Sequence, residues 1–414
     1  MMSRVGVAVI GGGPAGLSAA ISASTEGASV LLVEQDARLG GILKQCIHDD
    51  FGFTRYDERL AGPEYAFRDI SLLEQTNTIV LLQTFVSQII RNGSTFQLTL
   101  CNRHGIFKVE ATTIVFATGC RERTAKQASI HGMMPSGVMT AGTAQYYMNI
   151  HGQMPTKRCV IFGSNDIGMI MARRLTLEGA KVLGVFEPAD APVGRLRYVT
   201  QCLNDFDIPL HFEHTVSRTF GSQRLRAVEI CRVDKNQNPV NGSESIVKCD
   251  GLIISAGLIP ENDLAEALGI PLSDNTQGPI CDQNYMTMVD GAFSCGNAMQ
   301  VSDLVDYVSE SGEIAGRSAA RYMQQTRRYV KINASKDFLT FSPHCIDFDI
   351  MRGDIIIFFR ARTVRENATV CITVDGAEVF TEEYTALRPS EMERISVNLS
   401  DALNVDSKID VSLI

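Results

Sequence analysis

The stretch Val7-Ala8-Val9-Ile10-Gly11-Gly12-Gly13-Pro14-Ala15-Gly16 decides the fold of this chain of 414 residues. Its four apolar residues in a row predict a strand that is buried on both faces of a parallel sheet. The glycine spacing from Gly11 through Gly13 to Gly16 is typical of the turn into a helix that binds a dinucleotide. The first glycine permits the tight turn, the second lets the backbone approach a diphosphate, and the third lets helix and strand pack closely. The helix N-terminus then offers N–H groups and partial positive charge to the diphosphate.

An acidic residue follows this turn at the distance that a dinucleotide site requires. The apolar run 30–33 predicts the second strand, and Glu34 ends it, 18 residues after Gly16. A carboxylate in this position accepts hydrogen bonds from ribose hydroxyls. The sequence therefore predicts a complete nucleotide site within the first 40 residues.

The same pattern returns later in the chain. Residues 159–162 form a second apolar run, and a shift of 152 residues superimposes Gly11 on Gly163 and Gly16 on Gly168. Two such units predict an α/β fold with two Rossmann-like dinucleotide-binding domains. They also imply two nucleotide cofactors, and the simplest use of two is to pass electrons between them.

The second turn departs from the motif at its centre, where Asn165 stands in place of glycine. Asparagine tolerates left-handed backbone geometry better than most residues, so the turn is expected to survive. We expect its side chain to point toward the approaching diphosphate. There, a well-oriented amide donates to phosphate, whereas a badly oriented one costs roughly 1–3 kcal/mol of binding free energy.

Another acid, Glu187, closes the second strand of this unit, 19 residues after Gly168. A carboxylate suits two ribose hydroxyls and repels a 2′-phosphate, which favours NADH over NADPH. Arg195 and Arg197 lie just downstream and work against that preference.

Composition excludes several classes of function. A formal net charge of −9 and a pI near 5.4 argue against a nucleic-acid partner. The eleven cysteines include no CxxC pair, which is typical of reduced thiols in a reducing compartment and excludes a short-spaced metal site. His211 and His214 are expected on opposite faces of a strand, so no metal site is predicted there either. No apolar run approaches the roughly 20 residues of a membrane helix. We therefore predict a cytoplasmic protein.

Two further segments, 112–119 and 290–297, are buried strands that run into a small or polar turn. Together with the first glycine turn, they resemble the three FAD contacts of the pyridine-nucleotide-disulfide oxidoreductase superfamily. The resemblance implies that FAD is bound in the N-terminal unit and NAD(H) in the second. Asn297 stands where the family usually has aspartate. The implied FAD contacts are Gly11, Gly13, Pro14, Ala15, Gly16, Glu34, Gln35, Gly41, Ala117, Thr118, Gly119, Gly296, Asn297 and Leu304, and the implied NAD contacts are Gly163, Asn165, Ile167, Gly168, Glu187 and Gly257.

Four segments, 40–48, 141–145, 167–180 and 303–308, resemble one bacterial branch of the superfamily. Its members are FAD/NAD(P)-dependent oxidoreductases associated with glycerol-3-phosphate dehydrogenase, similar to the FAD-binding subunits of opine oxidase and hydrogen cyanide synthase. Members of the branch usually have histidine where this chain has Gln300 or Ser302. A helix from about 303 to 323 is expected to direct its N-terminus at the flavin.

The resemblance also implies the domain organisation. The FAD domain is expected to comprise residues 1–154 and 279–330, with the NAD(P) domain, 155–278, inserted in it. In residues 331–414 the spacing of apolar residues changes from a period of 3.6, typical of helices, to a period of 2, typical of strands. Asp375-Gly376 is a two-residue hairpin signal. At least five strands there predict a small β-sandwich-like domain, which serves either to dock a partner or second copy or as a stabilising cap.

Disulfide-reducing relatives have a cysteine pair after the double glycine, whereas here Cys46 alone follows Gly40-Gly41. Disulfide reduction needs an attacking and a resolving thiol, so it is not expected. By the resemblance, Lys44, Cys46, His48 and Tyr307 are the candidates to face the flavin. Cys46 is either a small apolar filler or a thiol that forms a flavin adduct or sulfenic acid.

Three functions remain open from the sequence. The first is a flavoenzyme that moves electrons between NAD(H) and a small-molecule or protein redox partner. The second is an FAD-binding subunit of a multi-component dehydrogenase that does not use NAD. The third is a partner-binding protein that keeps FAD as structure. A homodimer or association with a dehydrogenase subunit is compatible with each.

Overall fold

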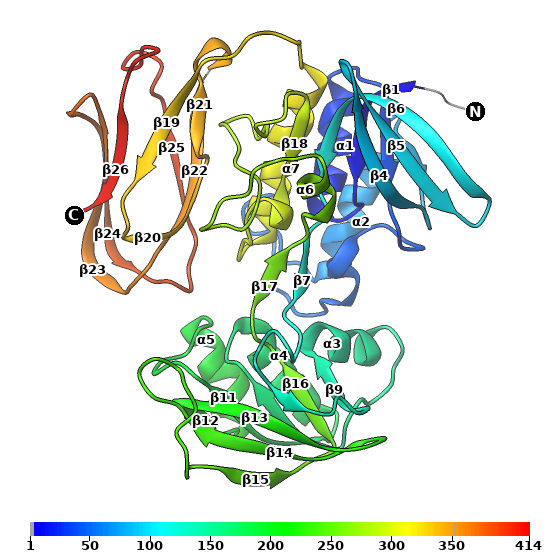
Figure 1. Ribbon diagram of the computed structural model, residues 1–414, viewed down its shortest axis with the longest axis vertical. Coiled ribbons are helices and arrows are strands. Elements are labelled where there is room, and N and C mark those ends of the chain that lie inside the picture. Colours follow the sequence, from blue (N-terminus) through cyan, green and yellow to red (C-terminus); the bar gives the residue numbers. More distant parts are fainter. Residues whose placement is uncertain (1–3, 352) are drawn as a thin grey trace. The chain divides into compact units, whose positions relative to one another are not determined.

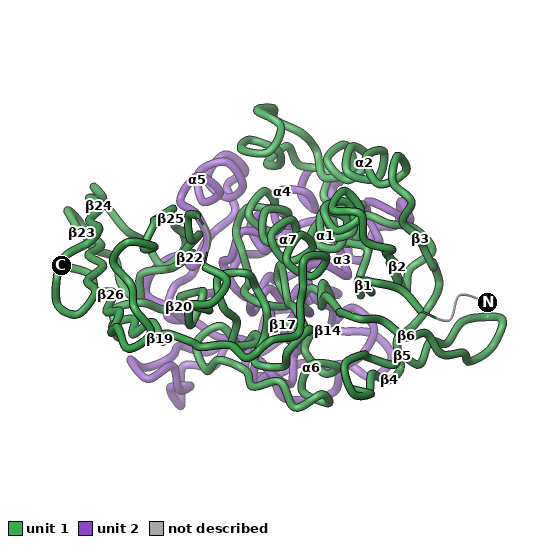
Figure 2. The backbone as a smooth tube through the Cα atoms, turned by 90° about the horizontal axis from the view of Figure 1, so that it is seen from above, with its two compact units in different colours: residues 1–120, 260–414 green, residues 121–259 purple. Residues whose placement is uncertain are grey.

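The computed structural model describes residues 4–351 and 353–414, and these fall into two units (Figures 1 and 2). Residues 1–120 and 260–414 belong to the first unit, and residues 121–259 to the second. The chain passes from one to the other through β7 (Cys120–Glu122) and β17 (Leu258–Pro260), which pair as a two-stranded sheet.

A mostly parallel sheet with the order β3-β2-β1-β6 forms the centre of the first unit. Residues Val7 to Ile10 of β1 pair in register with Val30 to Val33 of β2, so the two predicted strands are neighbours. The second half of β6 also pairs with β18, and its first half continues into an antiparallel edge of β5 and β4. The strands are β1 (Arg4–Ile10), β2 (Val30–Val33), β3 (Ile79–Leu81), β4 (Phe85–Asn92), β5 (Thr95–Asn102), β6 (Gly105–Phe116) and β18 (Ala292–Ser294).

Two long helices of this unit, α1 (Pro14–Thr25) and α7 (Val305–Ala320), pack directly against each other. Gly312 and Gly316 make this possible, because a Cβ on either would lie within 2.2 Å of a carbonyl oxygen of α1. Helix α7 is shorter than the expected 303–323, since the Asp303 side chain accepts hydrogen bonds from Arg360 and from the Met392 N–H instead. The remaining helices are η1 (Gly41–Gln45), α2 (Gly62–Leu73), α6 (Asp263–Ala267) and η4 (Gly296–Ala298).

A five-stranded parallel sheet, β12-β11-β10-β16-β9, forms the centre of the second unit, beside a four-stranded sheet β15-β14-β13-β8. Its strands are β8 (His131–Gly132), β9 (Val138–Thr140), β10 (Arg158–Phe162), β11 (Lys181–Glu187), β12 (Leu210–Phe212), β13 (His214–Gly221), β14 (Leu225–Arg232), β15 (Ser245–Lys248) and β16 (Gly251–Ile254). Its helices are α3 (Ala141–Asn149), α4 (Asp166–Leu177), α5 (Leu196–Tyr198), η2 (Val199–Leu203) and η3 (Asn204–Phe206).

The boundaries of this unit differ from those expected. Residues 121–154, expected in the FAD domain, lie in the second unit because β9 pairs with β16 and α3 packs on α4. Residues 260–278, expected in the NAD(P) domain, lie in the first. Strand β9 is thus an additional strand at the edge of the Rossmann-like sheet, and the glycine motif did not predict it.

Residues from Tyr329 onward form two sheets, β21-β19-β26-β23-β24 and β20-β22-β25, that share one apolar core. The Asp375-Gly376 turn joins β23 to β24 as expected, since Val374 pairs with Ala377 and both turn residues have positive φ. The strands are β19 (Tyr329–Ala334), β20 (Phe338–Ser342), β21 (Cys345–Asp347), β22 (Ile355–Ala361), β23 (Arg365–Val374), β24 (Ala377–Leu387), β25 (Glu393–Val397) and β26 (Ile409–Leu413), with the short helix η5 (Phe348–Ile350).

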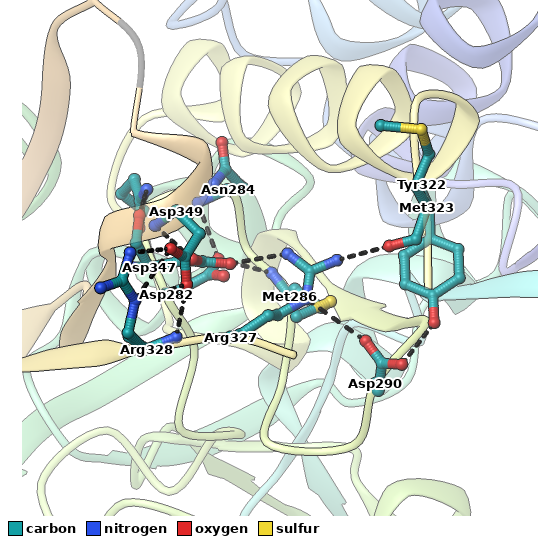
Figure 3. A network of polar contacts seen from close by, with 11 residues as sticks. Asp282, Asn284, Met286, Asp290, Tyr322, Met323, Arg327, Arg328, Asp347 and Asp349 are labelled. Atoms are coloured by element: carbon teal, nitrogen blue, oxygen red, sulfur yellow. Dashed lines mark hydrogen bonds and ion pairs between the residues drawn. The ribbon is translucent and has the colours of Figure 1, made fainter. Parts of the chain in front are cut away.

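A buried ionic network fastens the first of these sheets, through β21, to the rest of the first unit (Figure 3). Arg327 is at its centre: it donates to Asp347 of β21 at 2.6 Å and to Asp290, just before β18, at 3.3 Å. The Asp347 side chain is fully buried, and that of Arg327 is 6% exposed. The Tyr322 hydroxyl donates to the other oxygen of Asp290. The network therefore joins three segments that are far apart in the sequence.

Asp282 lies in the same region and makes the stability of the first unit depend on pH. Its Oδ1 accepts from the N–H groups of Asn284 and Met286, whereas its Oδ2 has no partner among the described residues. Burial raises the pKa of Asp282 to about 7, and the nearby Asp347 carboxylate contributes to the same shift.

The protonated form of Asp282 is therefore favoured in the folded state. The contribution of Asp282 to stability is therefore fully present below the unfolded-state pKa of about 4 and is lost as pH rises through about 7. Asp282→Asn, which replaces the acid with a neutral group of the same shape, is expected to raise the melting temperature at pH 8. The gain should disappear near pH 4, as thermal unfolding across pH will show. Exposed Asp401→Asn is the control, and a gain that does not depend on pH would contradict the assignment.

Candidate functional site

The first glycine turn joins β1 to α1, and its backbone packs closely against neighbouring backbone atoms. Gly11 has a φ of +105°, and a Cβ there would lie 2.3 Å from the carbonyl oxygen of Ala117. A Cβ on Gly16 would lie 1.8 Å from the carbonyl oxygen of Gly11. Both positions therefore require glycine for the fold itself, independently of any ligand.

Gly13 is different, because the protein leaves space beside it. Its backbone is extended, with a φ of −78°, which any residue adopts. Of the described atoms, only the Cα of Gly41 lies within 4 Å of a Cβ built there, at 3.9 Å. None of the described side chains caps α1 at this residue. The open space and the uncapped helix N-terminus together fit a diphosphate.

Glu34 is held in a fixed orientation beside this turn. Its Oε2 accepts from the Gly12 N–H and its Oε1 from the Asp36 N–H, each at 2.7 Å. The residue is 7% exposed, whereas Gln35 is exposed. Each carboxylate oxygen retains a lone pair for a ribose hydroxyl.

The other residues expected to contact FAD lie at the ends of β6 and β18. The Thr118 hydroxyl donates to the Glu261 carbonyl, which fixes the turn through Gly119. Gly296 lies against α1, where a Cβ would meet that of Ala15 at 2.7 Å. Asn297 accepts from the Ser302 N–H, and Leu304 precedes the first turn of α7. Both strands thus end beside α1, the helix that begins at the nucleotide turn.

The second glycine turn has the same carboxylate-to-backbone hydrogen bonds as the first. Glu187 Oε2 accepts from the Ser164 N–H at 2.8 Å, as Glu34 accepts from Gly12. Its Oε1 accepts from the Ala189 N–H at 3.0 Å, as Glu34 accepts from Asp36. Ser164 adds a bond of its own, because its hydroxyl also donates to Glu187. The repeat seen in the sequence is therefore also a repeat of site geometry.

The turn at Asn165 forms as expected, although not for the expected reason, and the expected direction of its side chain is wrong. Its φ is −69°, so no left-handed geometry is required. Its side chain turns back on the protein: Oδ1 accepts from the Gly168 N–H and Nδ2 donates to the Ser255 carbonyl. The amide caps α4, as asparagine does at many helix starts, because this pairs both of its polar ends. Gly163 and Gly257 have positive φ, while Ile167 lies in the first turn of α4.

Each of the four candidate catalytic residues makes contacts of its own. Lys44 donates to Asp36 and to the Arg38 carbonyl. Cys46 is 5% exposed, and burial raises the pKa of its thiol to about 12. The ring of His48 packs on Phe51, with ring centroids 4.9 Å apart. A thiol with this pKa supplies almost no thiolate near neutral pH, which favours the packing role for Cys46.

Tyr307, the fourth candidate, lines a cavity of about 590 Å³ in the first unit. Its ring contacts Phe358 of β22, and burial raises the pKa of its hydroxyl. The other lining residues are Thr54, Arg55, Asp306, Glu310, Glu313 and Arg394. The arginines are paired with carboxylates: Arg55 with Asp69 and Glu313, and Arg394 with Glu310.

His211 and His214 do not lie on opposite faces as expected. Their ring centroids are 5.9 Å apart, because Glu213 between them has a φ of +55° and breaks the strand. Phe186 stacks on His211. Within residues 4–351 and 353–414, no three His, Cys, Asp or Glu side chains are grouped to hold a metal ion. No helix in the described part of the chain has the length and apolar character needed to cross a membrane.

Comparison with known proteins identifies the family. The model of the pyridine nucleotide-disulphide oxidoreductases matches residues 5–333. The chain belongs to this family. Its members, among them thioredoxin reductases and ferredoxin–NADP reductases, use FAD and NAD(P)H.

Individual relatives of this oxidoreductase are distant. One subunit of opine oxidase from Agrobacterium tumefaciens is 25% identical over 334 residues, which cover 75% of this chain and 64% of the relative. Hydrogen cyanide synthase subunit HcnB of Pseudomonas aeruginosa is 26% identical over 284 residues, covering 63% and 59%. The chain thus spans about three fifths of the length of these two relatives. Thioredoxin reductase of T. acidophilum shares the fold, with a TM-score of 0.64, 19% identity, and coverage of 77% of this chain and 98% of that one.

The first site of this oxidoreductase fits FAD, since its turn is open and its carboxylate is oriented. Bound flavin would supply the electron-accepting and electron-donating chemistry. The main-chain N–H groups of the turn would hold the diphosphate, and Glu34 would hold the ribose.

Sequence reasoning missed the role of Gln300. Its amide donates to Thr340 and accepts from Ser342, so it fastens β20. No local pattern could have revealed this contact, because its partners lie about 40 residues away.

Proposed function

We propose that this protein is an FAD-dependent oxidoreductase that passes electrons between NAD(H) and an unidentified substrate or partner protein, without a redox-active disulfide. The observation that carries the proposal is the repeated geometry at Glu34 and Glu187. Each carboxylate ends a strand, accepts from the N–H of the second residue of a glycine turn, and is available to a ribose. Two such sites in one chain suit one electron carrier each.

The cysteines support the absence of a redox disulfide. The sequence has no CxxC pair. Cys46 is the cysteine that follows the double glycine, where disulfide-reducing relatives have a pair. It is buried, and burial raises the pKa of its thiol to about 12. Thiol–disulfide exchange needs an accessible thiolate, which this environment disfavours.

Anaerobic mixing of the FAD-loaded protein with NADH tests the proposal. Rapid bleaching of the visible flavin band is the expected result. No bleaching by either NADH or NADPH would overturn the assignment of NAD(H) as electron donor.

The nucleotide preference provides a second, quantitative prediction. Glu187 accepts three hydrogen bonds at the second turn, and its negative charge repels a 2′-phosphate. We expect kcat/KM for flavin reduction to be several-fold higher with NADH than with NADPH, and Glu187→Gln to narrow the difference. Equal or inverted values in the wild type would contradict the role given to Glu187.

A second candidate function is an FAD-binding electron-transfer subunit of a multi-component dehydrogenase that does not use NAD. The names of two relatives, one a subunit of opine oxidase and the other a subunit of hydrogen cyanide synthase, favour it. So does the second turn, whose helix N-terminus is capped by Asn165. Reduction of the flavin by an added dehydrogenase component but not by NADH is the result that this alternative requires.

A further inference from the structure

The loop after β11 lies on the N-terminus of α4. The Gly194 N–H donates to the Ser164 carbonyl at 3.0 Å, and the Val193 N–H donates to the Ser164 hydroxyl at 3.0 Å. In the first unit the Gly40 N–H makes the corresponding bond to the Gly12 carbonyl at 2.8 Å. The position of this loop is therefore common to both nucleotide turns.

The residues next to this contact differ between the two units. In the second unit, Arg195 donates its N–H to Asp166 Oδ1 at 2.8 Å and its Nε to Asp166 Oδ2 at 2.7 Å. The two side chains are 18% and 25% exposed. In the first unit, Pro14 takes the place of Asp166, and Gly41, which follows Gly40, takes that of Arg195. An ion pair thus crosses the second turn where the first has no side-chain charge.

Asp166 is the first residue of α4, at the end of the helix that carries the partial positive charge. Its carboxylate competes there with a diphosphate and repels it. Arg195 is held by Tyr198 as well, since its Nη2 donates to the Tyr198 hydroxyl at 3.2 Å and its guanidinium lies 5.0 Å from the ring centroid. Arg195, a cation that flanks this turn, is therefore already engaged.

We propose that the Asp166–Arg195 ion pair is a latch on the second nucleotide turn, which the diphosphate of NAD(H) must break in order to bind. Once released from Asp166, Arg195 pairs with the diphosphate. The latch rests on the proposed function, because it presumes that NAD(H) binds at this turn. The latch lowers the affinity of the second turn for NAD(H). Asp166 and Arg195 are therefore the residues that set the size of this reduction.

Calorimetric titration of the FAD-saturated protein with ADP-ribose tests the latch without any redox reaction. ADP-ribose carries the diphosphate and both riboses but no nicotinamide. Asp166→Asn keeps the shape, removes the charge and frees Arg195, and we expect it to tighten binding about tenfold. Arg195→Gln removes the cation and leaves Asp166 unpaired, and we expect it to weaken binding. Glu178→Gln is the matched control, since Glu178 pairs with Arg174 at the opposite end of the same helix.

The outcomes separate the latch from the proposed function. Asp166→Asn binding no more tightly than Glu178→Gln, or no binding by any variant, overturns the latch. Tighter binding by both Asp166→Asn and Arg195→Gln also overturns it, because Arg195 would then be only an obstruction. Flavin reduction by NADH is measured on the same samples. If Asp166→Asn binds ADP-ribose tightly but its flavin is not reduced, the latch stands and the proposed function fails.

Discussion

Gly13→Val is expected to give a folded protein that cannot hold FAD. The backbone at Gly13 is extended, and a Cβ there meets only the Gly41 Cα, at an ordinary contact distance of 3.9 Å. The added side chain instead fills the space through which the diphosphate reaches the N-terminus of α1. We expect FAD affinity to fall by more than about 100-fold, which corresponds to about 3 kcal/mol. Flavin content after purification and FAD titration of the apoprotein measure it.

Two companion variants make this result interpretable. Gly13→Ala adds one methyl group and should weaken FAD binding by a smaller factor. Ala377→Val is the control, because it adds two methyl groups at an exposed residue of β24, where a branched side chain is well tolerated. Far-UV circular dichroism and thermal unfolding report whether each variant is folded. Wild-type flavin content in folded Gly13→Val would show that FAD is not bound at this turn.

Arg327→Leu is expected to cause the largest loss of stability among single substitutions in the network of Figure 3. It removes the charged partner of Asp347, whose side chain is fully buried, and also a partner of Asp290. An uncompensated buried charge typically costs 3–5 kcal/mol, so we expect the free energy of unfolding to fall by about that amount. Urea unfolding followed by circular dichroism measures it.

The neighbouring residue provides the control. Arg328 pairs with Asp349 in the same region, but its side chain is 53% exposed, so Arg328→Leu should cost no more than about 1 kcal/mol. Adding Asp347→Asn to Arg327→Leu should recover part of the loss, because it removes the unpaired charge. Equal losses for Arg327→Leu and Arg328→Leu would show that burial does not set the strength of this network.

Local sequence was enough to predict the nucleotide turns. Gly11 is dictated by the positive φ of its own backbone and Gly16 by a contact with Gly11, five residues earlier, and Glu34 by the length of the helix and strand between them. The Asp375-Gly376 hairpin was predicted for the same reason, since its geometry depends only on its own residues and their flanking strands. Such features can be read from a single sequence because their causes are close together along the chain.

Local sequence did not predict the positions of the Asn165, His211 and His214 side chains. The direction of the Asn165 amide depends on Ser255, 90 residues away. The approach of His211 to His214 depends on the positive φ of a glutamate, which its residue type does not indicate.

The sequence by itself determined the family, the two nucleotide units and the residues that form their turns. Only the tertiary structure decided that Gln300 and Arg327 hold the C-terminal sheets and that Asp166 pairs with Arg195 across the second turn. The physical reason is the range of the interactions. Turn geometry is set largely by the backbone conformation of the turn residues themselves, whereas a charged or amide side chain takes whichever partner the completed fold brings within hydrogen-bond distance.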